Sequence, residues 1–239
     1  MAVKSDLILV AGGKGMRMGH HRNKIFMEVS GQSIASLTLQ RMTSFNMFDR
    51  IIISAQPVDI TELQQLDAVS ENPSKIIFVE GGETRSQSVR NAMMALRNFG
   101  FNEYIFVHDI VRPLISKHLM ERLLKKACSC SAVAPAITPT ETVRQKNEQD
   151  AFHSIDRDNV YLMQTPQVIS SELINTFFLN HESENLSLSD EMAFLERKGE
   201  PFKIIQGDPM NIKVTHREDI LRCEFFLAQL KQTKKSDHS

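Results

Sequence analysis

The chain has 239 residues, of which 41% are hydrophobic and 24% are charged. These fractions are ordinary for a globular protein and argue against a disordered chain. The 28 Lys and Arg residues nearly balance the 29 Asp and Glu residues, so the formal net charge is −1. This balance gives no electrostatic reason to expect a nucleic-acid binder or a membrane-surface binder. Any anionic ligand must therefore meet cations that are concentrated locally.

The expected compartment follows from the cysteines and from the apolar segments. Cys128, Cys130 and Cys223 are an odd number of cysteines in a chain long enough to fold without disulfides, which indicates a reducing environment. No segment approaches the roughly 20 apolar residues of a membrane span. The first residues lack the pattern of a signal peptide. We expect a cytoplasmic protein.

Short β-branched runs alternate with helical patterns along most of the chain. The predicted strands cover residues 6–11, 50–54, 75–79, 104–107, 131–136 and 202–206. The predicted helices cover residues 33–44, 59–66, 85–97, 116–126, 170–180, 189–198 and 216–231. Continuous apolar strands between helices are typical of a parallel sheet covered on both faces. The pattern predicts one α/β domain over residues 1–231, a Rossmann-like three-layer sandwich, followed by a polar tail over residues 232–239.

Residues 137–158 interrupt this alternation. Two polar, partly alternating segments flank a turn of the sequence Asn-Glu-Gln-Asp, which is the signature of a β-hairpin. A two-stranded hairpin is marginally stable alone. We therefore expect an inserted β-arm that either packs on a second subunit or covers the functional site.

A glycine-rich loop follows the first predicted strand. Such a loop can wrap its backbone N–H groups around phosphates, and ligands of parallel sheets bind beyond the carboxyl ends of the strands. The loop is neither a P-loop nor a G-x-G-x-x-G fingerprint. The loop itself contains two cations, Lys14 and Arg17, and a third, Lys24, follows it in the sequence. Phosphate binding is the favoured interpretation, and an ordinary tight turn is the alternative.

Six motifs in register resemble those of one family. They are the loop motif L-x-A-G-G-x-G-x-R-M-G with N-K-x-F behind it, residues 81–88, residues 108–113, residues 164–167, residues 190–191 and residues 211–215. Together they resemble sugar-phosphate nucleotidyltransferases, and most closely the 2-C-methyl-D-erythritol 4-phosphate cytidylyltransferase family of the non-mevalonate isoprenoid pathway. The likeness covers roughly residues 4–230.

The resemblance implies a Mg²⁺-dependent transfer of CMP from CTP to 2-C-methyl-D-erythritol 4-phosphate, with release of pyrophosphate. The attacking phosphate is already ionised near neutral pH, so no general base is needed. Catalysis would then consist of positioning and charge stabilisation. This reaction calls for a site rich in Arg and Lys, as the motifs are.

The resemblance also implies roles for particular residues. Those expected to be catalytic are Arg17, Lys24, Arg157 and Lys213. Those expected to bind CTP are Ala11, Gly12, Gly13, Lys14, Gly15, Gly82, Glu83, Arg85, Ser88 and Asp109. Those expected to bind the sugar-alcohol phosphate are Arg112, Thr142, Arg157, Thr165 and Lys213. Asp109 is also the expected Mg²⁺ ligand.

Structural roles stay open for several of these residues. Ser88 could belong simply to the first turn of a helix. Arg157 could pair with its acidic neighbours, and Arg112 could pair with Asp109. One departure from the family pattern is Met210, where several members carry Asp or another polar residue.

In the family the arm crosses to the neighbouring subunit, so the resemblance implies a homodimer with exchanged arms and shared sites. The expected partners are CTP and a sugar-alcohol phosphate, with no nucleic acid and no membrane. One alternative is ribitol-5-phosphate cytidylyltransferase, which shares most of the motifs. Another is a non-catalytic nucleotide-binding protein, against which the full set of Arg17, Lys24, Asp109 and Lys213 argues. The length is expected to leave no room for a second catalytic domain.

Overall fold

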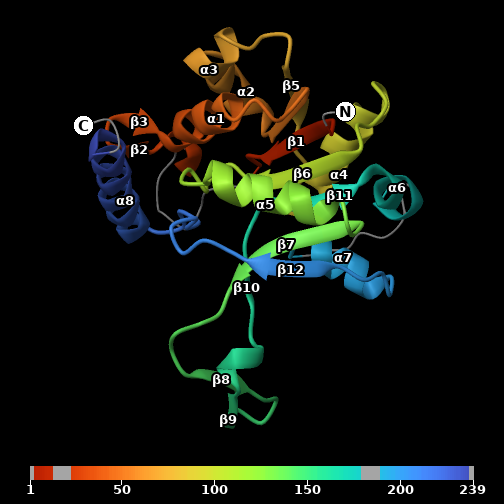
Figure 1. Ribbon diagram of the computed structural model, residues 1–239, viewed down its shortest axis with the longest axis vertical. Helices are drawn as coiled ribbons and strands as arrows, with labels where there is room; N and C mark the ends of the chain where they lie inside the picture. The colour runs from red at the N-terminus through yellow and green to blue at the C-terminus, as the bar shows by residue number, and fades with distance from the viewer. Residues whose placement is uncertain (1–2, 13–22, 179–188, 237–239) are drawn as a thin grey trace.

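A computed structural model describes residues 3–12, 23–178 and 189–236. Its centre is an eight-stranded sheet (Figure 1) with the order β10-β7-β11-β6-β1-β4-β5, in which β12 also pairs with β7. The strands are β1 (Ser5–Val10), β4 (Arg50–Ala55), β5 (Ile76–Glu80), β6 (Tyr104–Asp109), β7 (Ala132–Ile137), β10 (Leu162–Met163), β11 (Gln167–Ser170) and β12 (Lys203–Gln206). All six predicted strands are present, each within two residues of its expected ends.

The sheet is mixed, because two short strands that the sequence did not reveal run against the others. β11 lies between β6 and β7 and is antiparallel to both. β10 is antiparallel to the end of β7, where Leu162 pairs with Ile137. The four strands β5, β4, β1 and β6 remain parallel, as predicted. Their carboxyl ends therefore lie at one edge of the sheet.

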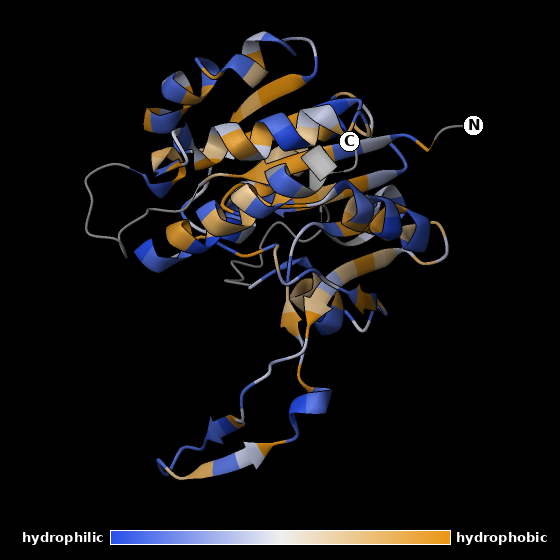
Figure 2. Ribbon diagram, turned by 60° about the vertical axis from the view of Figure 1, so that its left-hand side comes forward, coloured by the Kyte–Doolittle hydropathy of each residue, from blue (hydrophilic) through white to orange (hydrophobic). Residues whose placement is uncertain are grey.

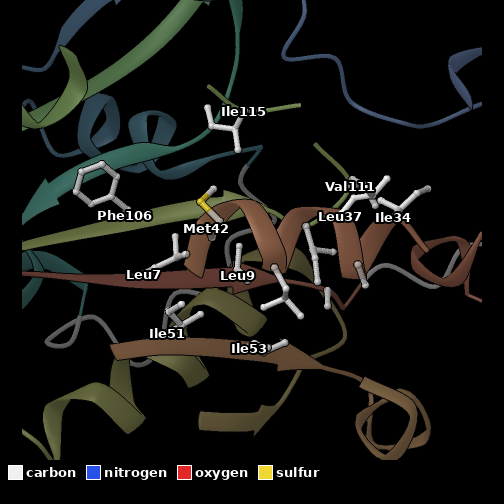
Figure 3. Close-up of a cluster of buried hydrophobic side chains, with 14 of the residues drawn as sticks. Leu7, Leu9, Ile34, Leu37, Met42, Ile51, Ile53, Phe106, Val111 and Ile115 are labelled. Atoms are coloured by element: carbon white, nitrogen blue, oxygen red, sulfur yellow. The ribbon is translucent and has the colours of Figure 1, made fainter. Parts of the chain in front are cut away.

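Helices cover both faces of the sheet, which confirms the three-layer sandwich. The helices are α1 (Ile34–Ser44), α2 (Pro57–Gln64), α3 (Asp67–Ser70), α4 (Arg85–Arg97), α5 (Lys117–Ala127), α6 (Ser171–Leu173), α7 (Glu191–Arg197) and α8 (Arg217–Ser236). Alternate residues of β1 point to opposite faces. Leu7 and Leu9 pack with α1 (Figure 3) in a core to which α5 and α8 also contribute, whereas Ile8 and Val10 pack in a second core with α4, α6 and α7.

Two helical segments differ from their predictions. The segment predicted as a helix over residues 170–180 is a single α-helical turn, α6, followed by the π-helix η4 (Ile174–Phe178). Helix α8 continues to Ser236, past residue 231 where its predicted end lay. Part of the expected polar tail is thus helical. Within the described ranges, no helix is both long and apolar enough to cross a membrane.

The inserted segment forms a hairpin of β8 (Val143–Lys146) and β9 (Phe152–Ile155), followed by the 3-10 turn η3 (Arg157–Asn159). Figures 1 and 2 show this arm projecting away from the sheet. Figure 2 also shows the central strands in hydrophobic colours, while the arm mixes polar and apolar residues. A second, smaller hairpin joins β2 (Glu28–Val29) to β3 (Gln32–Ser33) before α1.

Candidate active site

The predicted site residues on the sheet follow the carboxyl ends of its parallel strands. Ala11 and Gly12 follow β1, Gly82 follows β5, and Asp109 is the last residue of β6. Four predicted residues of the glycine-rich loop, Gly13, Lys14, Gly15 and Arg17, lie outside the described residues.

Lys24 opens the 3-10 turn η2 (Lys24–Phe26) and is half-buried. Its neighbour Asn23 caps this turn, because the Asn23 side chain accepts from the Ile25 N–H. The amide nitrogen of Asn23 in turn donates to Oδ2 of the buried Asp59 over 2.7 Å. The backbone that carries Lys24 is therefore anchored to α2.

Asp109 is the centre of the charged cluster. Its side chain is 8% exposed, and its carboxylate faces three cations from three different parts of the chain. Lys213 Nζ lies 2.8 Å from Oδ2, and Arg85 Nε lies 3.0 Å from Oδ1. Arg112 Nε is more distant, at 3.9 Å from Oδ2. Arg85, Arg112 and Lys213, all predicted to bind ligands, thus meet at one carboxylate. The structural role considered for Arg112, an ion pair with Asp109, is present only as this long contact.

These cations determine the ionisation of Asp109. Burial alone would raise the pKa of its carboxyl, but Arg85, Lys213 and Arg112 together hold that pKa well below its usual range. Burial likewise lowers the pKa of the Arg112 guanidinium, which Asp109 partly opposes. Asp109 is therefore a carboxylate at every physiological pH, and it acts as the counter-ion of the cluster.

Arg85 also binds a second buried carboxylate, Glu191, which the sequence analysis lists in the motif of residues 190–191 but assigns no role. Its Nη1 lies 2.6 Å from Glu191 Oε1 and its Nη2 lies 3.1 Å from Glu191 Oε2. Burial opposes the charge of Arg85, but Glu191 and Asp109 more than compensate and raise its pKa. The Arg85 guanidinium is thus bound to two protein carboxylates in this structure, while its predicted contact with CTP remains a prediction.

The motif of residues 164–167 joins the separate parts of the cluster. The Thr165 hydroxyl accepts the Asp109 backbone N–H over 3.1 Å. Gln164 and Asp208 form a reciprocal pair, in which the Gln164 amide donates to the Asp208 carbonyl and accepts the Asp208 N–H. The Asn211 amide donates to the Thr165 carbonyl over 2.8 Å. The loop that carries Lys213 is therefore fixed against the end of β6.

Arg112 is held by the same loop. Its Nη1 donates to the Asn211 carbonyl over 2.8 Å, and its side chain is buried. Asp208, the acid nearest to Met210 in the sequence, accepts the Met210 N–H through Oδ1. This carboxylate therefore stabilises the turn before Lys213.

A second group of predicted residues surrounds the loop after β5. The buried Ser88 hydroxyl accepts the Gly82 N–H over 3.1 Å and donates to the Thr84 carbonyl. A Cβ placed on Gly12 would lie 2.7 Å from Ser88 Oγ, so the loop after β1 packs directly on this hydroxyl. Gln56, which the sequence analysis did not select, donates to the Gly82 carbonyl over 3.1 Å.

The start of α4 fixes the positions of Arg85 and Ser88. The Thr84 side chain accepts the Gln87 N–H, and Gln87 accepts the Thr84 N–H in return, which forms a capping box. An N-cap of this kind stabilises a helix by about 1 kcal/mol. Glu83 precedes the cap and is exposed, and its backbone N–H donates to Gln87. Ser88 therefore has both a role in the helix turn and a position against the glycine loop.

The structure does not bring the arm residues to this cluster within one chain. Thr142 immediately precedes β8 and is exposed, and Arg157 is exposed in η3. Arg157 Nη1 donates to the Thr140 carbonyl over 2.6 Å. Both residues belong to the arm that projects from the sheet in Figure 1. Their predicted contact with a ligand remains a prediction.

A metal ion would find only limited protein ligands here. Within the described parts of the chain, no group of three or more His, Cys, Asp or Glu side chains is arranged to hold one. Asp109 offers a single carboxylate that is already shared by cations. Such a donor set fits an ion that keeps most of its ligands from water and phosphate, as Mg²⁺ does in nucleotide complexes.

Comparisons with known proteins agree with one another. The family model described as 2-C-methyl-D-erythritol 4-phosphate cytidylyltransferase matches residues 6–229. The protein of that name from Geobacillus kaustophilus is 31% identical over 223 residues, which cover 93% of this chain and 96% of the relative. Its counterpart from Thermotoga neapolitana is 33% identical over 216 residues, or 89% of this chain and 92% of the relative. The crystal structure of 4-diphosphocytidyl-2C-methyl-D-erythritol synthase from Anaerococcus prevotii has a TM-score of 0.82 and 26% identity, and the match covers 95% of this chain and 97% of that one.

Proposed function

Because this chain belongs to the 2-C-methyl-D-erythritol 4-phosphate cytidylyltransferase family, we infer that it transfers CMP from CTP to 2-C-methyl-D-erythritol 4-phosphate. The products are 4-diphosphocytidyl-2-C-methyl-D-erythritol and pyrophosphate, in isoprenoid precursor biosynthesis. A phosphate oxygen of the sugar alcohol bonds to the α-phosphorus of CTP, and the bond from that phosphorus to pyrophosphate breaks. The nucleophile is already ionised, so no proton has to move.

The observation that carries this function is the cationic cluster on Asp109. Lys213 has a 40% exposed side chain and donates one hydrogen bond to Asp109, so its other two N–H groups can reach a ligand. A lysine held by a buried carboxylate is pre-organised, and binding a phosphate then costs little side-chain entropy. We assign Lys213 and Arg112 to the phosphate of the sugar alcohol.

The remaining cations are assigned to CTP by the family resemblance. Arg17 and Lys24 would face the α-phosphate, where negative charge accumulates as the phosphorus becomes pentacoordinate. Anchoring of the Lys24 turn through Asn23 and Asp59 supports this role. The backbone around Gly82 would read the cytosine edge, since its N–H and carbonyl groups are fixed by Ser88 and Gln56.

We also propose that the reaction depends on Mg²⁺, with Asp109 as the protein carboxylate that would hold it. When bound, the ion would supply positive charge for the triphosphate and for the leaving pyrophosphate. The protein residues themselves bind and orient the two phosphate groups. Dependence on a divalent ion is tested by removing it with EDTA and restoring it.

We propose that two chains exchange their arms in a homodimer. Large apolar side chains are exposed along the arm, at its base and on the neighbouring sheet edge, namely Phe152 at 65%, Tyr161 at 51%, Leu162 at 48% and Ile204 at 36%. Leu162 and Ile204 lie on β10 and β12, which both pair with β7, and Tyr161 directly precedes Leu162, so exposed apolar residues gather where the arm joins the sheet. Such a group of exposed apolar residues indicates an interaction surface. An exchanged arm would also deliver Thr142 and Arg157 to the site of its partner. Light scattering that shows a fully active monomer would overturn this proposal.

A cytoplasmic location is proposed from the cysteine chemistry. Cys128, Cys130 and Cys223 are all free thiols. Burial raises the pKa of the Cys223 thiol to about 11, so this cysteine is unreactive. Free thiols persist in a reducing compartment.

One assay tests the function and its alternative. The purified protein is incubated with CTP, Mg²⁺ and either 2-C-methyl-D-erythritol 4-phosphate or ribitol 5-phosphate, and pyrophosphate release is followed. Lys213→Ala should reduce kcat/KM by on the order of 100-fold, since it removes a charge-assisted phosphate contact. Lys203→Ala, an exposed lysine on β12, is the matched control. Release with ribitol 5-phosphate alone would refute the assignment, and no release with either would favour a non-catalytic nucleotide binder.

A further inference from the structure

Glu191 is a buried acid that the proposed mechanism leaves without a role. Its side chain is 3% exposed, and it begins helix α7 directly after the N-cap residue Asp190. Gln167 of β11 fixes this helix end. The Gln167 carbonyl oxygen accepts the N–H groups of Glu191 and Met192 over 3.0 and 3.2 Å, and its amide donates to Asp190 over 2.9 Å. The Glu191 carboxylate therefore stands on a rigid base.

This carboxylate controls the orientation of Arg85. Both terminal nitrogens of the Arg85 guanidinium bind Glu191, at 2.6 and 3.1 Å, which leaves Nε as the group that contacts Asp109. Arg85 consequently binds only Oδ1 of Asp109. Oδ2 stays available to Lys213, whose Nζ lies 2.8 Å away.

We propose that Glu191 is a positioning residue for cytidylyl transfer, and this rests on the proposed function. By holding both terminal nitrogens of Arg85, Glu191 prevents Arg85 from forming a bidentate pair with Asp109. Lys213 thereby keeps its own place on Asp109, from which it meets the phosphate of the sugar alcohol. Glu191 also brings the cluster of three cations and two carboxylates to a net charge of +1.

The substitution Glu191→Gln separates this role from simple packing, because it keeps the shape of the side chain. The new amide N–H₂ would face a terminal nitrogen of Arg85, so a donor would meet a donor. Arg85 would leave this position and pair with both oxygens of Asp109, since bidentate pairing is the favoured arrangement of arginine and carboxylate. Lys213 would lose its partner and its fixed position.

The kinetic experiment measures wild type, Glu191→Gln, Lys213→Ala and the double variant in single-turnover assays with enzyme in excess. With saturating CTP, Glu191→Gln should lower the rate of transfer by on the order of tenfold. In the Lys213→Ala background the same substitution should have almost no further effect, because it acts through Lys213. Glu196→Gln, an exposed residue of the same helix, should behave as wild type.

Three results would overturn the proposal: an unchanged rate in Glu191→Gln, a loss that simply multiplies with that of Lys213→Ala, or an equal loss in the Glu196 control. If Glu191→Gln does not fold, Glu191→Asp tests the proposal in its place, because it keeps the negative charge but has a side chain one methylene shorter. Glu191→Asp should transfer CMP more slowly than the wild type at saturating CTP, and full activity would contradict the inference.

A structural readout distinguishes failure of this inference from failure of the proposed function. The crystal structure of Glu191→Gln, or of Glu191→Asp if only that variant folds, should show Arg85 shifted towards Asp109 and Lys213 displaced. An unmoved Arg85 refutes the positioning role, whatever the wild-type enzyme catalyses. Absence of transfer by the wild type, together with a displaced Lys213, would refute the proposed function alone.

Discussion

Because His108 is buried and neutral, we expect the folded protein to lose stability in mild acid. Its side chain is fully buried next to Asp109, with Nε2 at 3.2 Å from the Arg112 carbonyl and Nδ1 at 3.1 Å from the Thr165 hydroxyl. A carbonyl oxygen only accepts, so Nε2 carries the proton. Nδ1 then accepts from the hydroxyl of Thr165, which itself accepts the Asp109 N–H. The site is therefore built for a neutral imidazole.

The size of the effect follows from the pKa of His108. Burial lowers this pKa from 6.5 to about 4, although Asp109 opposes the shift. The unfolded chain takes up a proton near pH 6.5, whereas the folded chain does not until about pH 4. The contribution of neutral His108 to the free energy of unfolding is thus fully present above pH 6.5, and it is lost as the pH falls towards 4. At about 1.4 kcal/mol per pKa unit, the loss between pH 7 and pH 4.5 is about 2 kcal/mol.

The assay is urea unfolding at pH 7 and pH 4.5, in buffer without ligands or metal ions, for wild type and His108→Gln. Glutamine can still donate to the Arg112 carbonyl but does not titrate. From pH 7 to pH 4.5, the free energy of unfolding should fall by about 2 kcal/mol more in the wild type than in His108→Gln. His153→Gln, an exposed histidine of the arm, is the matched control and should follow the wild type. An equal acid loss in His108→Gln and wild type would refute the reasoning.

Three further substitutions test other parts of the structure. Asp6→Ala removes a fully buried carboxylate that accepts hydrogen bonds from Arg50 and Asn102. Urea unfolding should show a free energy of unfolding lower by about 3 kcal/mol, and steady-state kinetics should show an unchanged kcat. Asp59→Ala frees Asn23 and should lower kcat by on the order of tenfold, with CTP binding by calorimetry preserved. Gly12→Ala pushes against Ser88 and should raise the KM for CTP by on the order of tenfold at an unchanged melting temperature.

The sequence predicted the parallel part of the sheet well, because apolar runs and helical periods are local signals. It did not reveal β10 and β11, which have two and four residues. Their conformation comes from pairing with β6 and β7 rather than from their own composition. The segment after β11 has a helical pattern, but only one turn of it is α-helical.

For the site, the predicted residues that follow strand ends do converge, as Asp109, Arg85 and Lys213 show. Glu191 was visible only as part of a motif, because its partner Arg85 is 106 residues away and no spacing rule joins them. Gln56 was missed for the same reason. Its partner Gly82 follows a different strand, and a neutral amide gives no charge signal.

The way the arm leaves the sheet has a consequence for how this enzyme could evolve. The arm departs from the end of β7 and returns through β10, and Ile137 and Leu162 at these two points are paired neighbours. Adjacent strands lie about 5 Å apart, so a tight turn could join the same two residues. The length and sequence of the arm can therefore change without altering the register of any strand in the sheet. Deletion of the arm would spare the sheet but remove Thr142 and Arg157, so the part of the site on the sheet and the part on the arm can diverge separately in evolution.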